Sequence, residues 1–343
     1  MKYCVIFGAQ SYEHEISIVS AITLKDVLHR DLSFIFCDQH RDFYLIDSSK
    51  MKSKLFSSGD YKKESKLFLK EGGFYQKSFM KEKKVEFDIL INLVHGGDGE
   101  DGKFASLFTF FGIPFIGPSL EASVLSFNKL YTKWYAKERG IKTLSYELLQ
   151  KGSYDISIPF PVIIKPLRLG SSIGVSIITE QSELEYALDV AYEFDDEVLV
   201  EPFIDGVKEY NLAGCKGDDY IFSIVEEPHK EKFLDFDKKY LDFSRTKQVL
   251  QADIDESVVE KLKENFIKIY ENSFEGALIR CDFFIIDNEI YLNEINPIPG
   301  SYANYLFEDF SSVIDELSKH LKTEKTISIG YDYIHNIQKA KGK

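Results

Sequence analysis

The sequence predicts an α/β fold of three domains, and three observations carry this prediction. Residues 3–27 follow the order of a buried strand, a loop that contains Gly8, and an amphipathic helix, which is how an α/β unit begins. Residues 87–112 repeat this order around a loop rich in glycine and acidic residues. Residues 278–296 alternate in the way of a two-stranded hairpin. In such folds the functional site lies at the carboxyl ends of the strands.

Composition indicates a globular protein and excludes some partners. The chain has 343 residues, 44% hydrophobic and 29% charged, which is enough for two or three domains with their own cores. A net charge of −14 argues against a general nucleic-acid or membrane-surface binder. The four cysteines form no CxxC pair, and the start is too short for a signal peptide. We expect a cytoplasmic chain with neither nucleic acid nor membrane as partner.

Residues 1–120 form the first predicted domain, in which residues 113–118 add a short strand. Between its two strand–loop–helix units, residues 50–84 carry eleven lysines and four acidic residues, a local charge of +7. We interpret this segment as a solvated excursion rather than a binding patch, because no aromatic ladder accompanies the charge.

Residues 121–203 form the second predicted domain, a small α+β unit around a glycine–serine loop. A helical period at 121–141 precedes two strands that flank "IKPLRLGSSIG" at 164–174, and a helix and a strand follow. Two cations and small residues suit a polyanion held by charges and backbone N–H groups. A turn between two strands is the alternative. Residues 204–343 form the third domain, with a helix at 256–274, the hairpin and a C-terminal helix.

The hairpin predicts a metal site. One face of its two strands carries Arg280, Asp282, Phe284, Glu294 and Asn296. A three-residue turn at 287–289 places Asp282 directly opposite Glu294. The same register places Arg280 opposite Asn296. Two carboxylates about 5 Å apart repel unless a cation lies between them, and two carboxylates with an amide oxygen suit Mg²⁺. A solvated sheet face is the alternative.

Lys165, the glycine–serine loop, the carboxylate–asparagine set and Arg280 are the parts that a nucleoside triphosphate needs. The chain contains no GxxxxGK[ST], and its first loop, "GAQSYE", does not fit GxGxxG. Neither a P-loop ATPase nor a Rossmann dehydrogenase is therefore indicated.

Seven blocks of the chain closely resemble the ATP-grasp superfamily and, within it, the D-alanine–D-alanine ligases. They are "GAQSYEHEIS", "HGGDGEDG", "GPSLEASVLSFNK", "IIKPLRLGSSIGVS", "DDEVLVEPFIDG", "DKKYLD" and "IRCDFFIIDNEIYLNEINPIPG". They occur in the family's order between residues 8 and 300. The resemblance implies an ATP-grasp architecture with an N-terminal parallel-sheet α/β domain, a small central α+β domain and a C-terminal α+β domain. ATP would lie between the central and C-terminal domains.

The resemblance also implies the reaction. The carboxylate of a first D-alanine attacks the γ-phosphate of ATP to give an acyl phosphate and ADP. The amine of a second D-alanine then displaces phosphate and forms D-alanyl-D-alanine for peptidoglycan precursors. Two Mg²⁺ ions, or Mn²⁺, would assist the reaction. The resemblance also implies a homodimer. Catalysis of this kind depends mostly on orientation and charge neutralisation.

The resemblance assigns substrate contacts to named positions. Glu13 would hold the ammonium group of the first D-alanine, and His95 would lie at its carboxylate. Ser171 and Tyr240 match the two residues that form a hydrogen-bonded triad with this glutamate and lock a loop over the substrates.

The resemblance extends to the reacting groups and the second substrate. Arg280, with the backbone N–H of Gly300, would stabilise the transferring phosphoryl group and the tetrahedral intermediate. Beyond Gly300 the chain departs from the family. Tyr305 stands where a serine usually binds the second D-alanine, and Ser301 is the nearest small hydroxyl.

Nucleotide and metal positions carry over in the same way. The nucleotide set is Lys129, Lys165, Glu201, Phe203, Ile204, Glu209, Lys239 and Phe284. The lysines would contact phosphates, Glu201 would accept from the adenine amino group, and Glu209 would bind the ribose. The segment "GVKEY" is one residue longer than the commonest family spacing before Glu209. The metal ligands would be Asp282, Glu294 and Asn296.

Three alternatives remain beside the dipeptide ligase. The most distant enzyme among them is another ATP-grasp carboxylate–amine ligase. A depsipeptide ligase that joins D-alanine to D-lactate typically changes the lid tyrosine, which "KKYLD" keeps. A nucleotide-binding protein without catalysis should have lost some of the charged groups, whereas every expected one is present.

Overall fold

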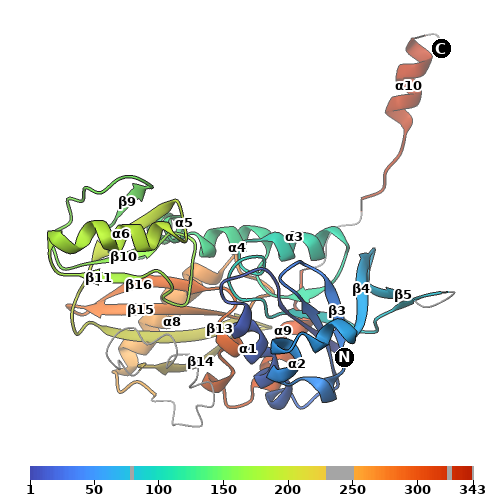
Figure 1. Ribbon diagram of the computed structural model, residues 1–343, viewed down its shortest axis with the longest axis horizontal. Helices are drawn as coiled ribbons and strands as arrows, with labels where there is room; N and C mark the ends of the chain where they lie inside the picture. Colours follow the sequence, from blue (N-terminus) through green and yellow to red (C-terminus); the bar gives the residue numbers. More distant parts are fainter. Residues whose placement is uncertain (78–80, 229–250, 323–326, 342–343) are drawn as a thin grey trace.

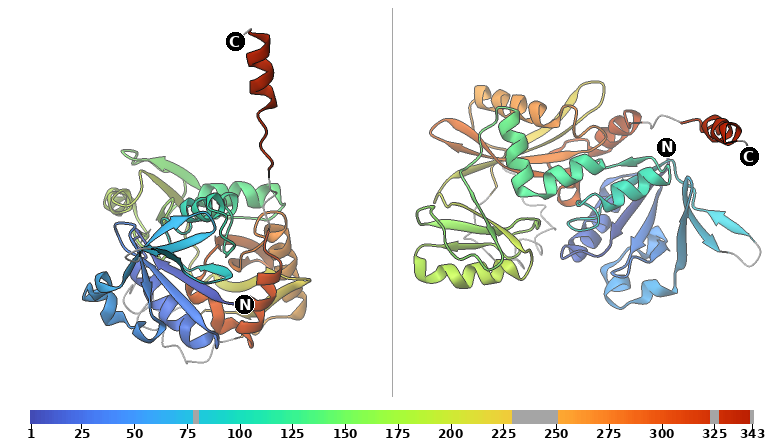
Figure 2. Two further views of the ribbon diagram at one scale, coloured as in Figure 1. Left: turned by 90° about the vertical axis from the view of Figure 1, so that its right-hand side faces the viewer. Right: turned by 90° about the horizontal axis from the view of Figure 1, so that it is seen from above.

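The computed structural model describes residues 1–77, 81–228, 251–322 and 327–341. Within these residues the strands form three sheets, one of eight strands and two of four. Figures 1 and 2 show helices packed on and between the sheets, in the α/β class that the sequence predicts.

The first sheet has a parallel half that begins at the N-terminus. Its strands are β2 (Leu32–Cys37), β1 (Tyr3–Gly8), β7 (Ile89–Asn92) and β8 (Phe115–Ile116), in that spatial order. Helix α1 (His14–Val27) packs on the face that carries Phe7, and α3 (Lys103–Phe110) packs on the face that carries Ile6. The loops that leave β1 and β7 therefore meet at one edge of the sheet.

The second half of this sheet is antiparallel and includes the lysine-rich segment. Its strands are β3 (Phe43–Ile46), β4 (Ser65–Lys70), β5 (Gly73–Lys77) and β6 (Glu82–Lys84), with η1 (Ser48–Lys50), α2 (Ser53–Ser57) and η2 (Asp60–Lys63) between the first two. The excursion predicted at 50–84 is thus largely part of the sheet. Some of its lysines pair with nearby acids at the surface, as Lys50 does with Glu64 at 2.8 Å and Lys66 with Asp42 at 2.6 Å.

The helical period at 121–141 corresponds to two helices rather than one. These are α4 (Leu120–Phe127) and α5 (Lys129–Glu138). Asn128 between them is extended, with φ −93° and ψ 108°, and its side chain accepts from the N–H groups of Leu130 and Tyr131. An asparagine N-cap of this kind starts a new helix and sets Lys129 at its first position.

The second sheet is antiparallel and holds the glycine–serine loop. Its strands are β9 (Glu147–Gln150), β10 (Val162–Pro166), β11 (Ser176–Ile178) and β12 (Glu197–Pro202). A short η3 (Gln181–Glu183) leads into α6 (Leu184–Tyr192), which covers one face through Leu184 and Leu188. The loop joins β10 to β11 at the edge of the sheet, as the sequence predicts.

The third sheet carries the predicted hairpin. Its strands are β13 (Lys208–Lys216), β14 (Tyr220–Glu226), β15 (Ile279–Ile286) and β16 (Glu289–Asn296), and α8 (Glu256–Tyr270) packs on one face. The hairpin turn has two residues rather than three. Asp287 and Asn288 have φ values of 51° and 62°, which a type I′ turn requires. A bulge at Asn293 then restores the predicted register at the site.

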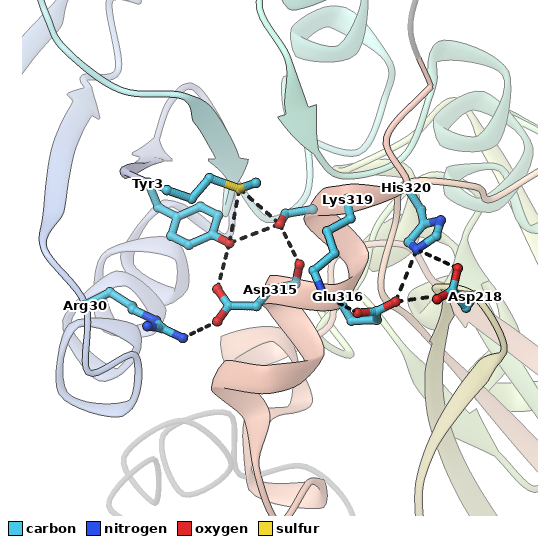
Figure 3. A network of polar contacts seen from close by, with 9 residues as sticks. Tyr3, Arg30, Asp218, Asp315, Glu316, Lys319 and His320 are labelled. Carbon is cyan, nitrogen blue, oxygen red and sulfur yellow. Dashed lines mark hydrogen bonds and ion pairs between the residues drawn. The ribbon is translucent and has the colours of Figure 1, made fainter.

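The C-terminal elements tie the third sheet to the first. They are η5 (Gly300–Leu306), α9 (Phe310–Lys319) and α10 (Asp332–Ala340). Figure 3 shows α9 beside the N-terminal strand, where Asp315 accepts from the Tyr3 hydroxyl at 2.9 Å and pairs with Arg30. At the C-terminal end of this helix, Nε2 of the capping residue His320 lies 3.1 Å from Glu316 Oε1. The first sheet therefore shares its core with the C-terminal region.

Helix α10 projects away from the rest of the molecule, and all of its residues are exposed (Figure 1). No helix in the described part of the chain combines the length and the apolar character that crossing a bilayer requires.

Candidate active site

Three loops converge on the carboxyl group of Glu13. This residue immediately precedes α1 and is 6% exposed. Its Oε1 accepts a hydrogen bond from the Ser171 hydroxyl, which belongs to the glycine–serine loop of the second sheet. A Cβ added to Gly96 would lie 2.4 Å from Glu13 Oε2, and one added to Gly170 would lie 3.1 Å from Oε1. Glycines on two loops thus allow the close approach, and the structure brings Glu13 and Ser171 together as predicted.

The surroundings of Glu13 control its charge. Burial raises the pKa of this carboxyl to about 7, and the nearby Glu100 acts in the same direction. The Ser171 hydrogen bond and His95 partly oppose the shift. The group therefore changes its charge near neutral pH.

His95 follows β7 and is held by two partners. Its Nδ1 lies 2.9 Å from the Ile298 carbonyl oxygen, which only accepts, so Nδ1 carries the proton. Its Nε2 then accepts from the Ser20 hydroxyl at 2.9 Å, and Ser20 Oγ accepts from the Ser301 N–H at 3.1 Å. Burial lowers the pKa of His95, which favours this neutral ring. The chain of bonds ties α1 and the loop after β7 to the segment after the hairpin.

Two lysines from different elements lie near the carboxylates of Glu201 and Glu294. Lys129 begins α5, and its Nζ donates to the carbonyl oxygen of Leu169 in the glycine–serine loop. Burial lowers the pKa of Lys129. Lys165 on β10 places Nζ 2.6 Å from Glu201 Oε2 and 3.4 Å from Asn293 Oδ1. Burial disfavours the Lys165 ammonium, but Glu201 outweighs it and the pKa is raised.

Glu201 on β12 is a buried carboxylate held by two cations. It is 3% exposed, and Lys133 Nζ pairs with its Oε1 while Lys165 holds its Oε2. Burial alone would raise the pKa of Glu201, but the two lysines lower it to about 2. The carboxylate is therefore ionised and can only accept hydrogen bonds. The sequence analysis did not identify Lys133 as a site residue. The feature that could have identified it is its position one helical turn after Lys129, because residues at this spacing lie on the same face of a helix.

The hairpin brings the predicted metal ligands together. Asp282 faces Glu294, and Arg280 faces Asn296, in the expected register. Arg280 donates to both oxygens of Asp282 at 2.7 and 2.8 Å, and Asn296 Nδ2 donates to Oδ2 at 3.0 Å. Burial raises the pKa of Asp282 to about 7, although Arg280 opposes this.

The charges around Glu294 differ from those around Asp282. Burial disfavours its carboxylate, but Lys129, Lys165 and Arg280 outweigh burial and lower the pKa of Glu294. The carboxyls of Asp282, which is buried, and Glu294, which is half-buried, form an all-oxygen donor set with the Asn296 amide. Lys129, Lys165 and Arg280 lie nearby. The donor set fits a hard divalent cation such as Mg²⁺.

The remaining predicted residues surround this cluster. Glu209 on β13 lies opposite Phe284 on β15, and Phe203 and Ile204 directly follow β12. Gly300 is the first residue of η5. Lys239 and Tyr240 lie outside the described residues.

The two candidates for the second substrate have different surroundings. Ser301 is 4% exposed, and its Oγ has no hydrogen-bond partner among the described residues. Tyr305 donates its hydroxyl to Glu226 Oε2 at 3.3 Å. Buried hydroxyl groups in folded proteins usually have a hydrogen-bond partner. The Ser301 hydroxyl is therefore available to form a hydrogen bond with a ligand.

Glu100 is a second residue that sequence analysis missed, although it lies in the quoted block "HGGDGEDG". Its Oε1 lies 3.7 Å from His95 Nδ1, and its side chain is 16% exposed. Burial raises the pKa of Glu100 to about 8. It therefore adds a titrating carboxyl next to Glu13 and Glu294.

The fold and the site together define a ligase of the ATP-grasp class. The second sheet carries Lys165 and Glu201, and the third carries a carboxylate–amide set. A glycine–serine loop reaches from the second sheet to the N-terminal site. Residues 2–118 match the family model described as D-ala D-ala ligase N-terminus, and residues 136–312 match D-ala D-ala ligase C-terminus. The chain belongs to the D-alanine–D-alanine ligase family.

Individual relatives agree with this membership. The chain is 63% identical to the D-alanine–D-alanine ligase of Wolinella succinogenes and 60% identical to that of a Sulfurovum species, in both cases over the full length of both chains. A solved D-alanine–D-alanine ligase from Helicobacter pylori is 51% identical, with a TM-score of 0.86 over 95% of this chain and 100% of that one. VanG D-Ala:D-Ser ligase from Enterococcus faecalis has a TM-score of 0.74 at 25% identity, over 92% and 98% of the two chains. The predicted fold class, ligase activity and use of ATP are confirmed.

Proposed function

We propose that this chain condenses two molecules of D-alanine into D-alanyl-D-alanine, with ATP converted to ADP and phosphate, for peptidoglycan precursors. One structural observation supports this proposal most directly. The Ser171–Glu13 hydrogen bond draws the glycine–serine loop over the first-sheet site, next to the lysines and the hairpin carboxylates. Such an enclosure excludes water from an acyl phosphate, which water would otherwise hydrolyse.

In the first step, a carboxylate oxygen of one D-alanine attacks the γ-phosphorus of ATP, and the bond from that phosphorus to the leaving oxygen of ADP breaks. Glu13 holds the ammonium group, so that the carboxylate is oriented for attack. Lys129 and Lys165 contact the phosphates. Arg280 faces the transferring group with a planar, permanent charge.

In the second step, the amine of the other D-alanine attacks the acyl carbon, and phosphate leaves. The tetrahedral oxyanion is stabilised by Arg280 and the Gly300 N–H. The unpartnered Oγ of Ser301 supports this residue, ahead of Tyr305, as the contact for the second carboxylate. Contact of His95 with the first carboxylate requires that Nε2 leave Ser20 and gain a proton, because Nδ1 carries the only proton of the neutral ring.

The residues that would hold Mg²⁺ are Asp282, Glu294 and Asn296. We propose two ions, and Mn²⁺ would suit the same oxygen donors. When bound, the ions supply neutralisation of the phosphate charge. Asp282 accepts one hydrogen bond at Oδ1 and two at Oδ2, from Arg280 and Asn296, so a lone pair on Oδ1 remains for a cation.

The nucleotide base lies at Glu201, which accepts from the adenine amino group, with the backbone of Ile204 beside it. Phe203 and Phe284 pack nearby, Glu209 binds the ribose, and Lys239 reaches the γ-phosphate. Tyr240 completes the triad with Glu13 and Ser171.

The larger organisation follows the same proposal. The domains span 1–120, 121–203 and 204–343, and the active protein is a homodimer. Use of ATP, together with four unpaired and buried cysteines, supports a cytoplasmic location.

The test is phosphate release by the purified chain with ATP and Mg²⁺, with products identified by mass. D-alanine, L-alanine, and D-alanine with D-lactate are compared. Release with D-alanine alone and formation of the dipeptide are expected. A depsipeptide at neutral pH, or no release with D-alanine, would contradict the proposal.

A further inference from the structure

Lys133 is a buried cation to which none of the proposed roles applies. It lies on α5, one turn after Lys129, with a side chain that is 4% exposed. Its Nζ pairs with Glu201 Oε1, donates to the Leu144 carbonyl oxygen at 3.3 Å, and lies 5.3 Å from the centroid of the Tyr146 ring. Burying an ammonium is costly unless a charged partner offsets the loss of water. Here that partner is Glu201.

Glu201 has a second cationic partner, but that partner has another task. Lys165 Nζ lies 2.6 Å from Glu201 Oε2, and it is also a proposed phosphate contact. An ammonium drawn toward phosphates cannot keep its full interaction with the carboxylate. Lys133 is enclosed by α5 and the segment before β9, so it stays on Glu201 when Lys165 moves.

We propose that Lys133 is a positioning residue for nucleotide recognition, which keeps the Glu201 carboxylate ionised and fixed while Lys165 turns to the phosphates. This inference rests on the proposed ATP-dependent function. An ionised carboxylate accepts from the exocyclic amino group of adenine, but it repels the oxo group that guanine carries at the same position. Lys133 thereby contributes to the preference for ATP over GTP.

Removal of the Lys133 charge should act on the nucleotide and not on the amino acid. In Lys133→Met, Lys165 is the nearest remaining counter-charge of the buried Glu201 and is held away from the phosphates. Affinity for ATP should fall about tenfold, as expected when a hydrogen bond to a charged group is lost. The ATP-over-GTP preference should fall by a similar factor, whereas the KM for D-alanine should stay within about twofold of wild type.

The experiment measures binding of ATP and of GTP to the full chain with Mg²⁺ by calorimetry, and KM for D-alanine by phosphate release. Lys133→Arg keeps the charge and should restore most of the ATP preference. Lys137→Met changes an exposed lysine one turn further along α5 and should behave as wild type. In a Glu201→Gln background, Lys133→Met should have little further effect, because Lys133 acts through that carboxylate.

Wild-type ATP affinity and preference in folded Lys133→Met would overturn the inference. Additive losses in the double variant, or an equal rise in KM for D-alanine, would also overturn it. If Lys133→Met does not fold, Lys133→Gln replaces it, and an unchanged ATP preference in that variant is decisive against the inference. A wild-type chain that binds no ATP would overturn the proposed function itself, and a failure confined to the variants leaves that function standing.

Discussion

The Ser171 hydroxyl donates a hydrogen bond to Glu13 across 158 positions of the chain. Glu13 lies in the loop after β1 of the first sheet and Ser171 in the loop after β10 of the second, so this bond joins the glycine–serine loop to the N-terminal site. In the proposed function, this contact closes the glycine–serine loop over the substrates.

Ser171→Ala should weaken this closure without disturbing the nucleotide. We expect KM for D-alanine to rise about tenfold, because one hydrogen bond to a charged group is lost. The Kd for ATP should change less than about twofold. Steady-state kinetics and calorimetry measure the two quantities. Ser182→Ala, at an exposed position beside α6, is the control. Equal changes in both constants would argue that Ser171 maintains the loop rather than the closed state.

The activity should depend on the ionisation of Glu13. Its pKa is about 7 because burial disfavours the charged form, and only that form attracts an ammonium group. The value of kcat/KM for D-alanine should therefore fall about tenfold for each pH unit well below this pKa. A pH profile measured at saturating ATP checks this, and Glu13→Gln should flatten the acid limb. An unchanged limb in that variant would assign the titration to another group.

Glu100 should make stability depend on pH. Its folded pKa of about 8 is above the ordinary value of 4.5, because burial disfavours the carboxylate. The neutral carboxyl therefore makes its full contribution to the free energy of unfolding below pH 4.5. This contribution is lost as the pH rises through about 8.

Glu100→Gln keeps the shape and cannot ionise. The free energy of unfolding of this variant minus that of wild type should therefore be about 4 kcal/mol larger at pH 8.5 than at pH 5, because the wild-type carboxyl loses its proton in the folded state across this interval. Urea unfolding at the two pH values measures this difference. A difference independent of pH would show that Glu100 does not carry the titration.

Glu294→Gln should abolish turnover at any Mg²⁺ concentration. Glu294 faces Asp282 across the hairpin, and an amide supplies less charge to a divalent cation than a carboxylate does. We expect kcat to fall at least about a hundredfold, measured as phosphate release. Glu289→Gln, at an exposed position on the same strand, should retain activity. Near-wild-type turnover in Glu294→Gln would remove this residue from the metal site.

The hairpin shows how sequence reasoning can reach the correct register through an incorrect turn. Alternation of polar and apolar residues set the faces of both strands, and this pattern is local. The turn was predicted one residue too long, and the bulge at Asn293 was not predicted. The two errors cancel at Asp282 and Glu294. A bulge depends on the fit between neighbouring strands, so the alternation of one strand does not reveal it.

The Glu201 cluster shows what the sequence could not supply. Glu201 and Lys165 were found as separate family positions, but their pairing with each other and with Lys133 depends on how α5 packs on the second sheet. Ion pairs between distant elements leave no periodic signal in a single sequence. The break at Asn128 was similar, because the helical period continues on both sides of it.

Tyr302 joins the C-terminal segment to the first sheet, and its hydroxyl should contribute measurably to stability. The side chain is fully buried and donates to the carbonyl oxygens of Asn92, at 2.7 Å, and Ile116, at 3.3 Å. Tyr302→Phe keeps the ring and removes the donor. Unfolding should then cost about 1–2 kcal/mol less, because buried carbonyls lose a partner. Urea denaturation measures the change, and Tyr333→Phe on the exposed α10 is the control and should change little. A loss confined to D-alanine binding, with stability unchanged, would instead make Tyr302 a support for the neighbouring Ser301.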